Sequence, residues 1–304
     1  MGFLYFLESI RMPGLNEFML LITRLGEETA FLAAALIVFW CVDKRRGYYL
    51  MTVGFIGTMA NQFLKLFFRV PRPWVLDENF TILEQAREAA AGYSFPSGHS
   101  QNAVGTFGSI AYTAKSRWAK WLCIAAAVLV PLSRMYLGVH TPADVLVGSG
   151  MALALVLGLK KPMLEGNDRN MKLLIAGMLA MAVGLLLYVE LYPFPADMDA
   201  HNLLSGRKNA YTMLGCLVGA AVIYVAEKNY VKFETKAVWW AQALKIVLGL
   251  GVVLLVKEGL RAPLDALFGG HLAARAVRYF LIVLVAGCFW PLTFRWFSRL
   301  GAKK

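Results

Sequence analysis

Charged residues are scarce in this chain, making up 16% of its 304 residues, while 59% are hydrophobic. Ordinary soluble domains are nearer half apolar, so this balance excludes a typical soluble globular protein. The apolar residues form long runs separated by short polar turns, a pattern typical of a polytopic membrane protein with helical spans. The net charge of +12 does not indicate a nucleic-acid partner, because most of the basic residues lie in those turns.

Cysteines and targeting signals are also few. The four cysteines are Cys41, Cys123, Cys216 and Cys288. They show no Cys-x-x-Cys spacing, and each lies in or at the edge of an apolar run, so we interpret them as buried small hydrophobic residues and not as disulfides or metal ligands. No cleavable signal peptide is evident, because the apolar stretch at residues 2–10 carries Glu8 and is too short to span a membrane.

Nine apolar stretches predict membrane spans, and an apolar segment with helical spacing precedes them. The stretches are approximately 27–42, 47–68, 98–115, 120–137, 142–160, 172–189, 210–227, 239–257 and 277–297. The predicted fold is an all-α transmembrane helical bundle in three parts. These are an in-plane amphipathic segment at residues 1–26, a five-span core at 27–160 and a four-span C-terminal region at 161–304.

The distribution of lysine and arginine predicts the orientation of the bundle. Basic clusters fall in alternate turns, at residues 44–46, 115–120, 160–172, 228–236 and 295–304. Because positively charged turns remain in the cytoplasm, these clusters mark the cytoplasmic face. The long link at 70–96, with a helix-like patch at 82–91, falls on the opposite face, where it could form either a lid or a solvated connector.

Two cations begin a series of three polar stretches on that opposite face. Lys65 and Arg72 lie about two helical turns apart, where Pro71 and Pro73 end a helix. Such a pair could bind an anion, or it could reach toward lipid headgroups.

The second stretch, Pro-Ser-Gly-His at residues 96–99, opens the third predicted span. Ser97 can cap the helix, Gly98 allows a close approach to the backbone, and the free N–H groups of a helix start favour phosphate. The alternative for this stretch is a plain capping turn that carries a surface histidine, His99.

The third stretch, residues 133–144, places Arg134, His140 and Asp144 between two apolar runs. Charged groups next to hydrocarbon are costly and are therefore usually functional. Thr141 and Asp144 also fit a capping box around Pro142, which would explain Asp144 structurally. In the functional alternative, Asp144 accepts a hydrogen bond from His140, fixes its tautomer and leaves the other ring nitrogen free to attack. The two roles are compatible.

Together the three stretches read Lys-x6-Arg-Pro, Pro-Ser-Gly-His and Ser-Arg-x5-His-x3-Asp, and over about residues 50–160 the chain resembles the type 2 phosphatidic acid phosphatase superfamily. This resemblance implies that His140 attacks phosphorus and forms a phosphohistidine, and that His99 protonates the leaving oxygen. It implies no metal ion and no other cofactor. The groups that it assigns to the phosphate oxygens are Lys65, Arg72, Arg134, Ser97 and the amide of Gly98. Three cations and a helix start also meet the physical needs of phosphoryl transfer, which are positioning and neutralisation of charge.

The sequence therefore predicts an integral membrane phosphatase that acts on a lipid phosphate or diphosphate monoester at a periplasmic, extracellular or lumenal face. A soluble-substrate (sugar) phosphatase and a lipid phosphotransferase are alternatives within the superfamily, and a transporter or channel is the alternative from another class. Undecaprenyl diphosphate, phosphatidylglycerophosphate, phosphatidate and sphingosine phosphate all remain open as substrates, as does the oligomeric state. In the C-terminal region, we expect His201, His271 and Lys245 to be structural.

Overall fold

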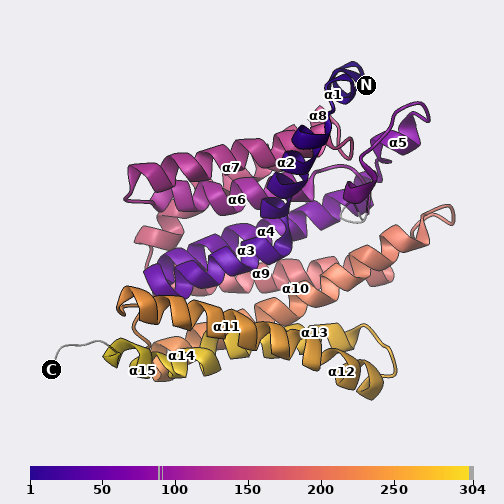
Figure 1. Ribbon diagram of the computed structural model, residues 1–304. Helices are drawn as coiled ribbons and strands as arrows, with labels where there is room; N and C mark the ends of the chain where they lie inside the picture. Colours follow the sequence, from indigo (N-terminus) through magenta and orange to yellow (C-terminus); the bar gives the residue numbers. More distant parts are fainter. Residues whose placement is uncertain (88–89, 91, 301–304) are drawn as a thin grey trace. The chain divides into compact units, whose positions relative to one another are not determined.

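The structure is a computed structural model that describes residues 1–87, 90 and 92–300, and this part of the chain is helical and contains no β-strand (Figure 1). The predicted all-α fold is confirmed. In chain order the helices are α1 (Gly2–Ser9), α2 (Pro13–Thr23), η1 (Arg24–Gly26), α3 (Glu28–Ile37), η2 (Val38–Val42), α4 (Lys44–Phe68), α5 (Pro73–Leu76), η3 (Glu84–Ala86), α6 (Gly98–Thr113), α7 (Arg117–Tyr136), α8 (Pro142–Lys160), η4 (Lys161–Glu165), α9 (Asp168–Leu191), α10 (Ala200–Ala226), η5 (Glu227–Val231), α11 (Trp239–Gly259), α12 (Arg261–Leu267), α13 (Ala273–Leu284), η6 (Val285–Phe289), α14 (Trp290–Leu292) and α15 (Phe294–Arg299).

The chain divides into two compact units. The first unit contains Met1–Ala34, Tyr49–Lys161 and Phe194–Gly206, and the second unit contains Ala35–Tyr48, Pro162–Pro193 and Arg207–Lys304. All three polar stretches predicted from the sequence belong to the first unit. This unit also takes in the link between α9 and α10, which comes from the C-terminal region of the sequence.

The protein is a multi-pass membrane protein. Six helices of the described residues are long and apolar enough to cross a membrane. A seventh span results if Pro13–Gly26 and Glu28–Val42, which are bent by 56° relative to each other, form one broken span. The predicted count of nine spans is therefore not confirmed and stays a prediction.

The other two predicted spans correspond to α4 and α6, which do not qualify as long apolar spans and which carry polar side chains into the first unit. Helix α6 has only 16 residues, and its Gln101 is buried, as are Asn61 and Lys65 of α4. The two helices pack closely, since a Cβ added at Gly57 would lie 2.1 Å from Nε2 of Gln101. Side chains that face a polar interior lower the hydropathy of a helix whether or not it crosses the membrane.

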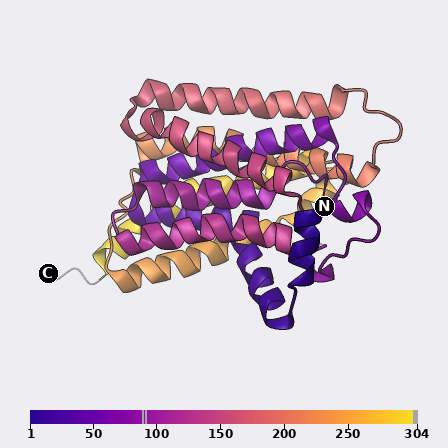
Figure 2. The ribbon, with the colours of Figure 1, turned by 90° about the horizontal axis from the view of Figure 1, so that it is seen from above.

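The N-terminal helices pack against the end of α7. Figure 2 shows α1 and α2 as a V-shaped pair, drawn in indigo. Leu4 of α1 is buried in a cluster with Phe80, Met135 and Val145, and Tyr136 Oη donates a hydrogen bond to Asn16 Oδ1 of α2 at 2.6 Å. The segment is thus fastened to the first unit, and its predicted position in the plane of the membrane stays a prediction.

Parts of two sequence predictions lie outside the described residues. These are Lys303 and Lys304 of the last basic cluster and positions 88, 89 and 91 of the helix-like patch at 82–91. The described part of that patch contains the short helix η3, and the link around it is fixed to the turn after α7, because Leu83 N donates to Leu137 O at 3.2 Å.

Two side chains of the second unit have structural partners. Nζ of Lys245, which lies within α11, donates to the carbonyl oxygens of Trp40 at 2.9 Å and Thr235 at 3.1 Å. His271 Nδ1 accepts a hydrogen bond from Ala273 N at 3.1 Å at the start of α13. These contacts agree with the structural roles expected from the sequence.

The four cysteines of the chain are free, with Cys216 buried and the others half-buried.

Candidate active site

The starts of α6 and α8 are joined by their backbones, and this brings the second and third polar stretches together. Ser97 N donates to the carbonyl oxygen of Asp144 at 2.9 Å. Close approach requires glycine on α8, because a Cβ added at Gly148 would lie 2.5 Å from Ser97 O. The turn between α7 and α8 also needs a glycine, since Gly138 has a φ of +83°, a conformation that other residues rarely adopt.

His140 lies in this turn and is buried. Its Nδ1 lies 3.4 Å from Asp144 Oδ2, and its Nε2 lies 2.9 Å from Nη1 of Arg72. Because an arginine only donates hydrogen bonds, Nε2 is the acceptor and the proton of the neutral ring belongs on Nδ1. Burial, together with the charges of Arg72 and Lys65, lowers the pKa of His140 well below its usual value of 6.5. The imidazole is therefore neutral at physiological pH, and the lone pair on Nε2 can act as a nucleophile.

Asp144 makes both contacts that the sequence analysis considered. It closes a capping box with Thr141, whose N donates to Asp144 Oδ2 at 2.7 Å and whose Oγ1 accepts from Asp144 N at 3.3 Å. The same Oδ2 faces the Nδ1 of His140 and also accepts from Ser94 Oγ at 2.6 Å. One buried carboxylate thus fixes the start of α8 and the orientation of the histidine.

Arg72 and Lys65 fasten the segment that leads into α6. Arg72 donates from Nε to Gly92 O at 3.0 Å and from Nη1 to Val139 O at 2.9 Å, and Lys65 Nζ donates to the carbonyl oxygen of Tyr93. Burial lowers the pKa of Arg72 to about 10, which leaves its guanidinium protonated at neutral pH. Lys65 therefore lies next to the segment before α6, and Arg72 lies between that segment and the turn that carries His140.

Arg134 and His99 carry buried polar atoms without partners in the described part of the chain. Arg134 is completely buried and donates from Nη1 to Thr23 Oγ1 at 2.7 Å. Its Nε and Nη2, and Nε2 of His99, have no hydrogen-bond partner. Because buried polar atoms are almost always paired and the unpaired nitrogens of Arg134 can only donate, these atoms indicate a place for a ligand with acceptor oxygens. An anion such as phosphate fits the charge.

Ser97 and Gly98 form the start of α6 as the sequence predicted. Ser97 Oγ accepts hydrogen bonds from Ser100 N at 3.4 Å and Ser100 Oγ at 2.9 Å, so Ser97 is the N-cap of α6. A Cβ added at Gly98 would meet only Asn61 Oδ1, at 3.7 Å. The structure thus brings His140, Asp144 and Arg72 into direct contact, and it places Lys65, Ser97, Gly98, His99 and Arg134 in the same unit around them.

Two residues of this cluster were missed by sequence reasoning. Ser94 bridges Asp144 and His140, with Oγ 3.4 Å from His140 Nδ1, and Thr23 holds Arg134 from 111 positions away in the chain. Neither residue belongs to a recognisable motif. Serine and threonine are also common at turns and helix ends, so their residue types alone give no signal.

Models of known protein families match most of the chain, beyond the three short motifs. A family model described as PAP2 superfamily matches residues 46–164, and one described as PAP2 superfamily phosphatase, transmembrane extension, matches residues 211–304. The chain belongs to the PAP2 superfamily. The resemblance and the enzyme class predicted from the sequence, a membrane phosphatase, are therefore confirmed. The PAP2 match covers the three polar stretches, and the second match covers most of the C-terminal region.

Three curated PAP2 relatives are similar to the chain. It is 34% identical to phosphatidylglycerophosphatase B of Bacillus subtilis (strain 168), over 54% of this chain and 80% of the relative. It is 30% identical to the undecaprenyl-diphosphatase BcrC of the same organism, over 47% of this chain and 72% of the relative. An undecaprenyl-diphosphatase of Sulfolobus acidocaldarius is 30% identical over 44% of this chain and 64% of the relative. No solved structure shows a significant match to the chain.

Proposed function

We propose that this protein hydrolyses a phosphate or diphosphate monoester of a lipid at the non-cytoplasmic face of a membrane, through a phosphohistidine on His140. The observation that carries the proposal is the position of His140. Its Nε2 faces Arg72 Nη1 at 2.9 Å, and its Nδ1 faces the carboxylate of Asp144 at 3.4 Å. A histidine held in one tautomer by an acid, with a cation beside its free nitrogen, suits attack on a phosphoryl group.

The reaction has two steps, transfer of the phosphoryl group to His140 and its hydrolysis by water. In the first, Nε2 of His140 forms a bond to phosphorus while the bond from phosphorus to the leaving oxygen breaks, and His99 gives that oxygen a proton. In the second, water attacks the phosphohistidine, His99 takes the proton from water, and inorganic phosphate leaves with regeneration of His140. Arg72 Nη1 lies where the phosphorus must approach Nε2 of His140, so it must move from Nε2 to a phosphate oxygen as the substrate binds.

The charge that develops on the phosphoryl oxygens is met by cations and by a helix start. Arg134 offers Nε and Nη2, which are unpaired in the described part of the chain. Lys65, in the last turn of α4, and Arg72, just after α4, supply the other two positive charges. The amide of Gly98 belongs to the first turn of α6, where the free N–H groups and the helix dipole favour anions. Preorganised donors of this kind stabilise a transition state more than a bound ground state.

Lipid substrates are favoured by the relatives, whose names describe a phosphatidylglycerophosphatase and undecaprenyl-diphosphatases. Release of inorganic phosphate from a panel of lipid phosphates and a sugar phosphate, with and without an alcohol acceptor, tests this proposal. Release from lipids without an acceptor supports it. Release from the sugar phosphate alone, or transfer only to an acceptor, would favour the other members of the superfamily.

We expect turnover without a metal ion, because arginine and lysine supply the positive charge at the site. The described residues contain no group of three or more His, Cys, Asp and Glu side chains that could hold a metal. Phosphate release should therefore be the same before and after treatment with EDTA, and vanadate should inhibit as a pentacoordinate mimic. A loss of activity in EDTA that Mg²⁺ restores would contradict this expectation.

We expect the link before α6 and the end of η4, just before α9, to lie on opposite sides of the membrane. Asn79 and Glu165 are exposed, and each can be changed to cysteine without removing a buried group. In intact cells, an impermeant thiol reagent should label Asn79→Cys, whereas Glu165→Cys should react only after permeabilisation. The unmodified protein, with its buried or half-buried native cysteines, provides the background. Labelling of both positions from one side would refute the predicted orientation.

A further inference from the structure

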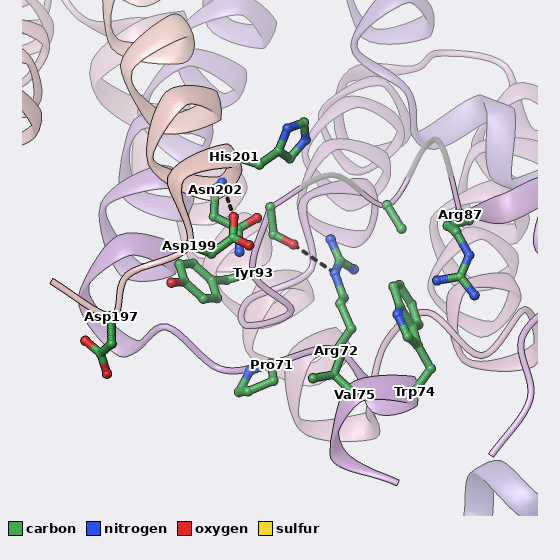
Figure 3. A pocket seen from close by; sticks show the side chains of 12 residues that line it. Pro71, Arg72, Trp74, Val75, Arg87, Tyr93, Asp197, Asp199, His201 and Asn202 are labelled. Carbon is green, nitrogen blue, oxygen red and sulfur yellow. Dashed lines mark hydrogen bonds between the residues drawn. The ribbon is translucent and has the colours of Figure 1, made fainter. Parts of the chain in front are cut away.

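A cavity of about 510 Å³ lies beside Arg72 within the first unit. Figure 3 shows Arg72 between two groups of side chains. On one side are Trp74 and Arg87, and on the other are Asp197, Asp199 and His201. We name this space the Arg72 cavity.

The acidic wall of the Arg72 cavity comes from the link between α9 and α10. Residues Phe194–Gly206, which contain most of this link and the start of α10, belong to the first unit. Helix α10 packs closely on α4, because a Cβ added at Gly206 of α10 would lie 2.7 Å from Leu66 Cδ1. Asp199 caps α10 by accepting a hydrogen bond from Asn202 N at 2.7 Å. The C-terminal region of the sequence thus supplies part of a cavity that adjoins the candidate active site.

Arg72 is shared by the cavity and the candidate active site. Its Nη1 lies 2.9 Å from Nε2 of His140, and its guanidinium carbon lies 5.9 Å from the ring centre of Trp74 in the cavity wall. A phosphate bound at His140 and Arg72 would therefore place the rest of its substrate next to the Arg72 cavity. Before the scissile bond breaks, the leaving group occupies the space beside that bond, and here that space is the Arg72 cavity.

The chemistry of the walls defines which leaving group fits. Ionised carboxylates only accept hydrogen bonds, so Asp197 and Asp199 suit donors such as hydroxyl groups and repel a second phosphate. The positive charge of Arg87 is already engaged, because its Nε and Nη2 donate to Glu84 at 2.7 and 2.8 Å, and it lies over Trp74. Among the described residues that line the cavity, the carboxylates of Asp197 and Asp199 are then the acidic groups that an incoming leaving group would meet beyond Arg72.

We propose that the Arg72 cavity binds the leaving group, and that Asp197 and Asp199 select a hydroxyl-bearing leaving group over one that carries a second phosphate next to the scissile bond. The inference rests on the proposed function and narrows its substrate class. It favours a phosphate monoester of a glycerol-type headgroup over a lipid diphosphate.

The test compares two lipids in the same detergent micelles. Phosphatidylglycerophosphate loses its terminal phosphate from phosphatidylglycerol, which has a glycerol hydroxyl next to the scissile bond and a phosphodiester only beyond the glycerol. Undecaprenyl diphosphate loses its terminal phosphate from undecaprenyl phosphate, whose phosphate is attached directly to the scissile oxygen. Initial phosphate release gives kcat/KM for each lipid. Asp197→Asn and Asp199→Asn remove one charge each at nearly constant shape, and asparagine preserves the cap of α10. Asp265→Asn, at an exposed position that does not line the cavity, is the matched control.

The ratio of the two kcat/KM values should move toward undecaprenyl diphosphate by about tenfold in each variant. Phosphatidylglycerophosphate loses a hydrogen bond to a charged group, and undecaprenyl diphosphate is freed from a repulsion. The control should leave the ratio unchanged. An unchanged ratio in both variants, or an equal loss on both lipids, would overturn this inference alone. Release by the unmodified protein from undecaprenyl diphosphate but not from phosphatidylglycerophosphate would also overturn this inference alone. Absence of release from every lipid of the panel described above would overturn the proposed function and this inference with it.

Discussion

Replacement of His140 by alanine should abolish phosphate release, with a fall in kcat of more than about 10³-fold, as is usual when a nucleophile is removed. No other side chain can take its place. His99, the other histidine of the site, is assigned to move protons, and the remaining groups assigned to the site bind phosphate or orient His140. Phosphate release in detergent micelles, followed over hours at high enzyme concentration, measures the residual rate.

Two further variants separate loss of chemistry from loss of fold. His140 is buried, so His140→Gln keeps most of the side-chain volume and should be as inactive as His140→Ala. His271→Ala removes a histidine from the link between α12 and α13 and should keep full activity. Thermal unfolding of each purified variant shows whether it is folded. A folded His140→Ala protein with the activity of the unmodified protein would refute the proposed nucleophile.

Replacement of His99 by alanine should cost about 10²- to 10⁴-fold on a lipid alkyl phosphate, which is the usual contribution of a general acid. The loss should be much smaller on p-nitrophenyl phosphate in the first chemical step, because its leaving group departs without a proton. Stopped-flow measurement of the burst of p-nitrophenolate isolates that step from hydrolysis of the intermediate. Equal losses in the first step on both substrates would indicate that His99 binds phosphate instead of donating the proton.

The core of the site could be predicted because its residues occur in short motifs with strong local geometry. Thr141, Pro142 and Asp144 specify a helix start by their spacing alone, and the structure contains the predicted capping box. Ser97 is likewise the N-cap of α6. Once two helix starts are located on one side of a membrane, the side chains that follow them are constrained to the same region.

The supporting contacts could not be predicted, because they depend on packing between distant segments. Thr23 meets Arg134 only because α2 packs on α7, and Ser94 reaches Asp144 only because Lys65 and Arg72 hold the preceding segment. From the sequence we expect His201 to be structural, and nothing there gives a reason for it to line a cavity with Arg72. In each case the fold of the first unit decides the contact.

The span count shows a different limit of sequence reasoning. Hydropathy identifies helices that face lipid, whereas α4 and α6 turn Asn61, Lys65 and Gln101 into the first unit. Length and apolarity therefore support six or seven spans among the described residues, although each of the nine predicted stretches falls mostly on helix. The side chains that make the site also make its helices hard to identify as spans.

The most direct test of the account is to trap the phosphoryl group on the enzyme. His99→Ala should accumulate the covalent intermediate with p-nitrophenyl phosphate, because the first step needs no acid and the second lacks its base. After a rapid alkaline quench, peptide mass spectrometry should find the phosphoryl group on His140, with the acid lability of a phosphohistidine, and His140→Ala should carry none. A phosphoryl group on another residue, or a burst of product with no phosphorylated peptide, would contradict the mechanism.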